Sequence, residues 1–344
     1  MRNFEQGKGL VKRRQFLALG GGLASAMAAA PLLGLAQETG RTPASASAST
    51  GTLGANRLVL LGTKGGPRVG GTGGNLANLS RMNPANLLVI GGVPYVIDCG
   101  YGVSMQLVRA GIPLPQLRYV FITHHHSDHQ LEYGNLLYAA WASGLNHPVD
   151  SYGPPGLEKM TRDFLALNAI DIATRIEDEG KPDLRRLIQA HDIRNLDRVF
   201  GNGQVKVSAM RSLHPPFHDS YGLKFEFEGK TVVFSGDTAY NPKLAEFASG
   251  ADYLVHEVQY GPGVEALAKR LPNAKRALEH FLASHTMTED VGRIAAAAGV
   301  KNLVLSHFVP GDDPSITDEM WVEGVRKHYK GNILVGRDLM SIDL

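Results

Sequence analysis

The 344-residue sequence predicts an α/β fold, a four-layer αββα sandwich in which two sheets pack face to face and helices cover both outer faces. Short apolar, β-branched runs alternate with helical patterns from about residue 57 onwards. These runs form two strand-rich halves, 57–152 and 203–344, with a charged helical stretch at about 155–200 between them. Two packed sheets with helices on both outer faces would bury this pattern as one domain.

The individual elements follow from the same periodicities. Strands are predicted at 58–61, 87–90, 95–97, 119–122, 205–207, 223–227, 231–234, 253–255, 303–305 and 333–335. Helices are predicted at roughly 103–110, 131–143, 155–170, 241–249, 263–282, 288–298 and 317–329. The helical insertion at 155–200 is a candidate cap over a pocket.

The first 36 residues are predicted to be a twin-arginine signal peptide. A basic stretch that contains Arg13 and Arg14 precedes a Gly/Ala-rich apolar run that ends near Ala36. The run is long enough to approach a membrane span, so an uncleaved anchor is the alternative. Residues 37–56 are predicted to be a flexible leader, since few of their side chains can pack. We therefore expect the twin-arginine export machinery as a partner, a periplasmic or secreted protein, and no membrane span after signal removal.

The charge of the exported chain differs from that of the whole sequence. Five of the 35 Lys and Arg residues and one of the 33 Asp and Glu residues lie in 1–36, which leaves 30 and 32 and a formal net charge of −2. Proteins that bind nucleic acid usually carry a basic balance, so no nucleic acid is expected as a partner. Cys99 is the one cysteine of the sequence, so no intrachain disulfide can form and the fold must depend on a large core.

Four of the 13 histidines and an aspartate lie in the stretch THHHSDH at 123–129. It directly follows a buried strand, which places it at the edge of the sheet where α/β proteins tend to carry their chemistry. From there His124, His126, Asp128 and His129 can point into one cavity. Imidazole and carboxylate together suit zinc or a related divalent ion. A fortuitous surface patch is the alternative for an isolated cluster of this kind.

Three later strands also end close to a metal-competent side chain. These side chains are His214, Asp237 and His307. Four strand ends that each deliver such a side chain are an unlikely coincidence, so the pattern favours a built metal site.

Together these residues resemble the metallo-β-lactamase superfamily, through HxHxDH at 124–129 and the three later side chains. The resemblance covers 57–344 and implies a hydrolase domain with two zinc ions, although other divalent transition metals could replace them. It assigns His124, His126 and His214 to one ion, Asp128, His129 and His307 to the other, and Asp237 to both. The ions would hold a bridging hydroxide that attacks the substrate, so no protein nucleophile is needed. Asp98 is expected to orient a ligand or to cap a strand end, and His125 has no ligand role.

Two further segments indicate one branch of this superfamily. LVHEVQY, with His256, and SHTMTED, with His285, resemble segments of the ribonuclease Z and arylsulfatase-like branch. The resemblance implies that both histidines help to protonate the departing oxygen, so Asp128, His256 and His285 are the candidate catalytic residues. Simple hydrogen bonds to loops are the alternative for the two histidines. His147, His191, His280 and His328 are assigned structural or surface positions.

A small-molecule ester, an aryl sulfate or phosphate ester, is the leading substrate interpretation. His214 and Asp237 are 23 positions apart, which leaves no room for a long tRNA-gripping arm, and export would separate the protein from tRNA. The alternatives are a ribonuclease Z-like phosphodiesterase, a lactonase or β-lactamase-type hydrolase, and a metal-binding protein without turnover. Arg68 and Arg81 flank a glycine-rich stretch and are candidate anion-binding residues. The sequence does not specify the oligomeric state, and a homodimer is compatible with it.

Overall fold

The computed structural model describes residues 53–68 and 81–344, which lie within one compact unit. The predicted signal peptide and nearly all of the predicted leader lie outside the described residues and stay predictions. None of the helices in 53–68 and 81–344 is both long and apolar enough to cross a membrane.

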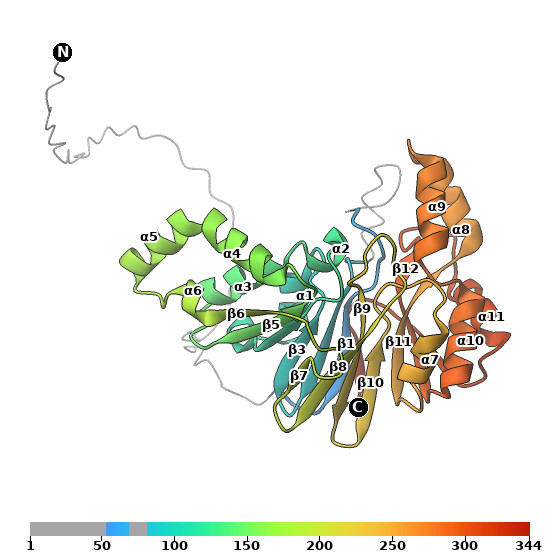
Figure 1. Ribbon diagram of the computed structural model, residues 1–344, viewed down its shortest axis with the longest axis horizontal. Helices are drawn as coiled ribbons and strands as arrows, with labels where there is room; N and C mark the ends of the chain where they lie inside the picture. The colour runs from blue at the N-terminus through green and yellow to red at the C-terminus, as the bar shows by residue number, and fades with distance from the viewer. Residues whose placement is uncertain (1–52, 69–80) are drawn as a thin grey trace, which may run out of the picture. The chain divides into compact units, whose positions relative to one another are not determined.

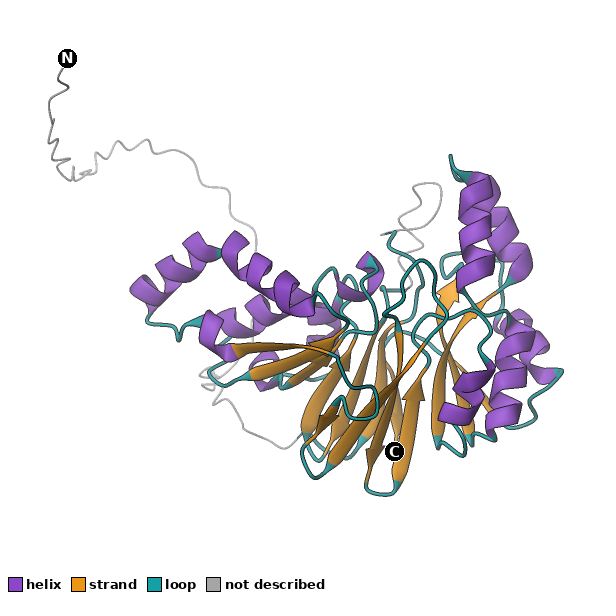
Figure 2. Cartoon of the chain, in the orientation of Figure 1, coloured by secondary structure: helices purple, strands orange, loops and turns teal. Residues whose placement is uncertain are grey.

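The described residues form two seven-stranded sheets (Figure 2). The first has the order β14 (Met340–Asp343), β1 (Arg57–Gly62), β2 (Ala85–Ile90), β3 (Val93–Ile97), β4 (Tyr119–Phe121), β5 (Val149–Gly153) and β6 (Ile188–Asp192). The second has the order β13 (Asn332–Val335), β12 (Asn302–Val309), β11 (Tyr253–Gln259), β10 (Lys230–Phe234), β9 (Tyr221–Phe227), β8 (Val205–Arg211) and β7 (Phe200–Gly201). In each sheet the pairings on one side are antiparallel and those on the other are parallel.

The sheets pack through alternate residues of their strands. Along β1, Leu58 and Leu60 face the core between the sheets, where they meet side chains of the second sheet such as Phe225. Val59 and Leu61, which point the other way, belong to the core beneath the first helical layer. Both faces of this strand are therefore buried, as an interior strand of a four-layer sandwich requires.

Helices cover both outer faces (Figure 1). The first face is covered by α1 (Val103–Arg109), α3 (Tyr133–Ala142), α4 (Leu157–Leu167), α5 (Ala169–Glu179) and α6 (Leu184–Leu187). The second is covered by α7 (Pro242–Phe247), α10 (Thr288–Ala298) and α11 (Asp318–Arg326). The predicted αββα sandwich is confirmed.

Two more helices, α8 (Gly261–Lys269) and α9 (Ala274–Ser284), pack against each other and project beyond the strand ends in Figure 1. We predicted a single helix over 263–282. The chain breaks it at 270–273 because Pro272 has no backbone N–H to donate and its ring obstructs the preceding turn.

The interpretation of 155–200 as a purely helical insertion is wrong. This segment also contributes β6 and β7, the edge strands of the first and the second sheet. An edge strand needs few buried side chains, and in β6 Ile188 alone is buried. Its sequence, IQAHD, therefore lacks the short apolar, β-branched run on which the strand predictions depended.

Candidate active site

Each of the three strands β4, β8 and β10 is followed closely by one of the predicted ligands, in the order His124, His214 and Asp237. His307 lies inside β12, at a bulge where Ser306 pairs with Glu257 and Phe308 with Val258. The φ angle of His307 is 46°, a left-handed conformation that turns its side chain out of the regular alternation. The bulge thus directs His307 towards the other ligands at the ends of the strands.

The first group contains three imidazoles and a carboxylate. His126 Nδ1 lies 3.1 Å from His124 Nε2 and 2.9 Å from His214 Nε2. Asp237 Oδ2 lies 3.8 Å from both of these Nε2 atoms. Three ring nitrogens and a carboxylate oxygen converge here as they would around one cation.

The second group adjoins the first through Asp237. His307 Nε2 lies 3.6 Å from Asp128 Oδ2 and 3.2 Å from Asp237 Oδ2. His129 Nε2 lies 3.3 Å from Asp237 Oδ1. Asp128, His129 and His307 thus form a compact set, and the structure brings all seven predicted ligands together with Asp237 between the two groups.

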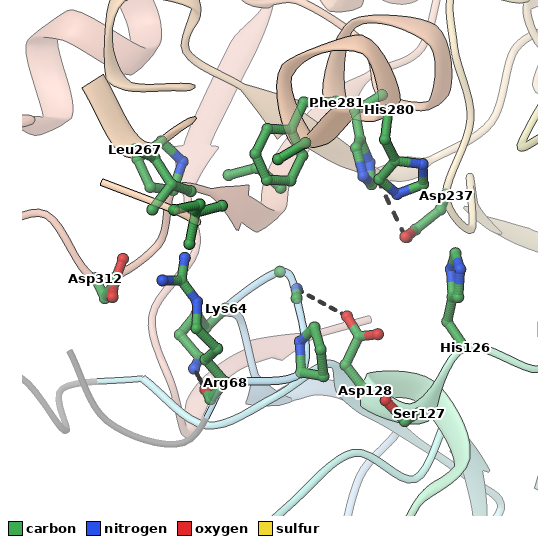
Figure 3. A pocket seen from close by; sticks show the side chains of 18 of the residues that line it. Lys64, Arg68, His126, Ser127, Asp128, Asp237, Leu267, His280, Phe281 and Asp312 are labelled. Atoms are coloured by element: carbon green, nitrogen blue, oxygen red, sulfur yellow. Dashed lines mark hydrogen bonds and ion pairs between the residues drawn. The ribbon is translucent and has the colours of Figure 1, made fainter. Parts of the chain in front are cut away.

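Neighbouring groups fix the orientation of several of these side chains. His129 Nδ1 donates to the Asp98 carboxylate at 2.8 Å, which leaves His129 Nε2 directed at the cluster. Asp98 also accepts a hydrogen bond from the backbone N–H of Thr123, so it both orients a ligand and caps the strand end. The backbone N–H of Gly66 donates to Asp128 Oδ2 at 2.8 Å (Figure 3).

The donor set fits a divalent transition metal. Burial lowers the pKa values of His124 and His126 and brings the pKa of His214 to about 4, so these imidazoles are neutral. Burial would raise the pKa values of Asp128 and Asp237, but the nearby His129 and His307 hold both below their usual range. Neutral imidazole and ionised carboxylate are the forms that bind metal. Burial opposes protonation of His129 and His307, but Asp237 and the neighbouring carboxylates raise the pKa of His129 well above its usual value and that of His307 to about 10. A bound cation would therefore take the place of the protons on these two rings.

Several buried atoms of the cluster also lack partners. Within the described residues, His129 Nε2, His307 Nε2 and Asp237 Oδ1 make no hydrogen bond. Buried polar atoms are rarely left in this state, and metal coordination would satisfy all three. The mixture of nitrogen and oxygen donors suits zinc, and also other ions of similar preference.

The prediction that His256 acts at the site is not supported by its position. His256 Nδ1 contacts the carbonyl oxygen of Glu257, and no hydrogen bond or ion pair within the described residues joins the His256 side chain to the cluster. Neighbouring residues of a strand point to opposite faces, and the residue of β11 that faces the site is Glu257. Glu257 Oε2 accepts a hydrogen bond from His285 Nδ1 at 2.9 Å.

His285 does lie at the site. Its Nδ1 is 4.0 Å from Asp237 Oδ2, and its ring is stacked against that of His307. Burial lowers the pKa of His285, but the charge and hydrogen bond of Glu257, together with the charge of Asp237, raise it above its usual value. His285 can therefore hold a proton close to the cluster.

A cavity of about 440 Å³ opens in front of the cluster. One end is formed by His126, Asp128, Asp237 and His285, and the rest by α8, α9 and two loops (Figure 3). The remaining described lining residues are Lys64, Gly65, Gly66, Pro67, Arg68, Ser127, Leu267, Leu271, Asn273, Arg276, Ala277, His280, Phe281, Val309, Pro310 and Asp312. None of the described residues of 155–200 lines it, so α8 and α9 supply the wall that we had predicted for that segment.

The cavity bears on two other predictions, the anion-binding residues Arg68 and Arg81 and the assignment of His280. Arg68 lines it, as expected for an anion-binding residue, whereas Arg81 donates to Thr63 and Gly336 and stacks over Phe308. His280, which we had assigned to a structural or surface position, also lines the cavity. The helical spacing of Asn273, Arg276 and His280 would have shown a shared polar face, but it would not have shown what that face meets.

Metal removal should destabilise the protein. Asp128 and Asp237 are buried next to each other, and a cation between them would offset their repulsion. We expect chelation with EDTA to lower the melting temperature by roughly 5 °C or more, and added zinc to restore it, since a bound ligand stabilises the folded state. Calorimetry with elemental analysis measures this. Protein that carries no transition metal and melts at the same temperature with EDTA would contradict the metal site.

Comparison with known proteins places the chain in a family. The family model described as "Anti-Pycsar protein Apyc1" matches residues 68–307, more than two thirds of the sequence. The chain belongs to this family. It is 28% identical to Ribonuclease Z of Mycobacterium marinum over 277 residues, which cover 80% of this chain and 96% of the relative.

Solved structures confirm the fold. The metallo-β-lactamase fold protein YhfI from Bacillus subtilis matches with a TM-score of 0.60 and 19% identity over 85% of this chain and 100% of its own. Zinc-bound PqqB from Methylobacterium extorquens matches with a TM-score of 0.59 and 15% identity over 84% and 100%. The chain has the metallo-β-lactamase fold. Its similarity to proteins named Ribonuclease Z supports the predicted branch, and together with the cluster of His and Asp side chains it supports a metal-dependent hydrolase.

The relatives overturn one prediction. We expected no nucleic acid partner, yet the curated relatives carry the name of a ribonuclease. The net charge of the chain misled us because it averages over the whole surface. Lys64, Arg68 and Arg276 line the cavity together with Asp128, Asp237 and Asp312, so the net charge of the chain does not show where its basic side chains gather.

Proposed function

We propose that this protein is a metal-dependent phosphodiesterase that hydrolyses a nucleotide phosphodiester. The observation that carries the proposal is Asp237, which lies between two groups of ligands at one end of a cavity lined by three basic side chains. Similarity to proteins named Ribonuclease Z supports a phosphodiester over the aryl sulfate that the sequence had favoured.

The residues present can hold two divalent ions, for which zinc is our proposal. His124, His126 and His214 would hold one, Asp128, His129 and His307 the other, and Asp237 would contribute to both. A pair of ions at this place supplies an activated water and stabilises the charge that develops on phosphate oxygens.

The protein itself supplies the proton for the leaving group. Glu257 accepts from His285 Nδ1, so a protonated His285 has its Nε2–H free to donate. The raised pKa of His285 keeps the ring protonated closer to neutral pH than an ordinary buried histidine. His285 therefore acts as the general acid, and Glu257 orients it.

The cavity matches the other parts of a nucleotide. Lys64, Arg68 and Arg276 provide positive charge for phosphate oxygens, whereas Leu267 and Phe281 provide an apolar wall for a base. Its volume of about 440 Å³ lies within the usual range of small-molecule sites. A longer RNA would have to extend out of the cavity.

A substrate panel tests the proposal. Zinc-loaded protein should hydrolyse bis(p-nitrophenyl) phosphate and at least one nucleotide phosphodiester, from a set of short RNAs, dinucleotides and 3′,5′-cyclic mononucleotides of the four bases. It should act at least 100-fold more slowly on p-nitrophenyl sulfate, a lactone and a β-lactam. Turnover of the sulfate or lactone with no phosphodiester hydrolysis would reject the proposal and leave the metal site intact.

A further inference from the structure

We propose that His280 is a specificity-determining residue that accepts a hydrogen bond from a substrate hydroxyl next to the scissile phosphate, and so selects ribonucleotides. This inference rests on the proposed phosphodiesterase function. His280 belongs to none of the metal-ligand groups, and its role follows from how α9 presents it.

The imidazole of His280 borders the cluster from α9. Its ring centroid lies 5.8 Å from that of His126, 6.0 Å from His214 and 5.9 Å from His285. Figure 3 shows it projecting from the helix towards Asp237 and His126. It is too far out to replace a ligand but close enough to meet a group attached beside a phosphate bound at the cluster.

Ser284 determines which nitrogen of His280 faces the cavity. The hydroxyl of Ser284 donates its single proton to the carbonyl oxygen of Pro215 at 3.1 Å. It must then accept at the 3.2 Å contact with His280 Nδ1, so the proton of a neutral His280 is on Nδ1. Nε2 is left as an acceptor, and no hydrogen bond within the described part of the chain uses it.

The same turn of α9 ties this arrangement to the metal ligands. The backbone carbonyl of Ser284 accepts from His214 Nδ1 at 2.9 Å, which directs His214 Nε2 at the cluster. Ser284 therefore orients a ligand with its carbonyl and His280 with its hydroxyl. The acceptor on His280 is held in a fixed position relative to the first ligand group.

With an acceptor at His280 Nε2, the protein can distinguish substrates that carry a hydroxyl beside the phosphate from substrates that lack it. Of the polar side chains of α9 that line the cavity, Arg276 can only donate, so His280 is the acceptor that this helix presents to a substrate donor. The group that a ribonucleotide has and a deoxyribonucleotide lacks is the 2′-hydroxyl, which can donate and lies beside the phosphate. Phe281, the next residue of α9, supplies the apolar surface for the attached base.

The test compares ribonucleotides with their 2′-deoxy counterparts. Wild-type protein should hydrolyse the ribonucleotide phosphodiester roughly tenfold faster in kcat/KM than the deoxy form, as one neutral hydrogen bond allows. His280→Phe should reduce this ratio to about one. His280→Gln, whose Oε1 can replace the Nε2 acceptor, should retain most of it. Ser284→Ala, which frees the imidazole but keeps the carbonyl for His214, should reduce it in part.

Binding provides a second readout that needs no turnover. Calorimetric titration of the metal-loaded protein with ribonucleoside and 2′-deoxyribonucleoside monophosphates should show the same preference, lost in His280→Phe. Glu279→Ala, on the exposed face of the same helix, is the matched control and should change neither ratio. A ratio near one in wild type, or an unchanged ratio in His280→Phe, overturns the inference while phosphodiester hydrolysis persists. If wild-type protein hydrolyses no phosphodiester, the proposed function is wrong. The monophosphate titrations then still test whether His280 selects ribonucleotides.

Discussion

Replacing Asp237 with alanine should reduce phosphodiester hydrolysis roughly 10³-fold or more and should lower the metal content to half or less. Asp237 is the carboxylate common to two groups of ligands, with His124 and His214 on one side and His129 and His307 on the other. Its loss removes a negative oxygen donor from both groups at once, so neither ion would be held at its position. Steady-state rates and elemental analysis of the purified variant measure the two effects.

The matched control is His191→Ala. His191, on the edge strand β6, pairs with Asp150 of the neighbouring strand β5 at 2.9 Å, and no hydrogen bond or ion pair within the described residues joins it to any of the seven ligands. This variant should keep both its metal and its rate to within about threefold. Asp237→Ala protein that is folded by circular dichroism and retains near-wild-type turnover would show that hydrolysis does not depend on the cluster. Full turnover by wild type together with background turnover in the variant would exclude a metal-binding protein without activity.

The sequence was sufficient to predict the fold and the positions of the ligands because both are recorded in local patterns. The strand cores, such as 58–61 and 231–234, are nearly continuous apolar runs, which is typical of strands that are buried on both faces. Each ligand is a polar residue at or near the end of such a run, and the carboxyl ends of neighbouring strands meet at one edge of a sheet. The histidine at 307 differs, since it occupies a bulge inside β12 that the pattern LVLSHF does not reveal.

The parts that could not be predicted depend on contacts between distant segments. The cavity wall comes from α8 and α9, and nothing in the sequence of these helices shows that they stand over residues 124–129. The amphipathic pattern of α9 predicts a buried face, but the same pattern would arise if that face packed on a core. The edge strand β6 was missed for the opposite reason, since it buries too little to leave a pattern.

His256 and Glu257 show, within a single pair of residues, that the sequence does not reveal contacts between distant segments. From the motif LVHEVQY we predicted that His256 acts at the site, and histidine is the most frequent proton donor in catalysis. In β11 the two side chains point to opposite faces, so only the register of the strand decides between them. The structure turns Glu257 to the site, where its Oε1 accepts from the backbone N–H of Thr238 and its Oε2 from His285.

The position of Glu257 beside His285 can be tested directly. Glu257→Gln should lower kcat by roughly 10²–10⁴-fold with the metal content unchanged, because the amide keeps the shape of the side chain but removes the charge that keeps His285 protonated. The pH profile should change as well. Glu257 raises the pKa of His285 against the effect of burial, so its loss lowers that pKa, and the alkaline limb of the kcat profile should move to lower pH.

His256→Asn is the matched control, one residue away on the same strand. Asparagine can keep the contact that His256 Nδ1 makes with the carbonyl oxygen of Glu257, so kcat and the alkaline limb should stay within error of wild type. Its melting temperature should fall, since His256 is fully buried. If His256→Asn instead lost activity and shifted the alkaline limb while Glu257→Gln did neither, the assignment of the proton donor to the Glu257–His285 pair would be wrong. The comparison distinguishes a structural disturbance from loss of the Glu257 charge. A structural disturbance lowers kcat without moving the alkaline limb of the pH profile, whereas loss of the charge beside His285 must move it.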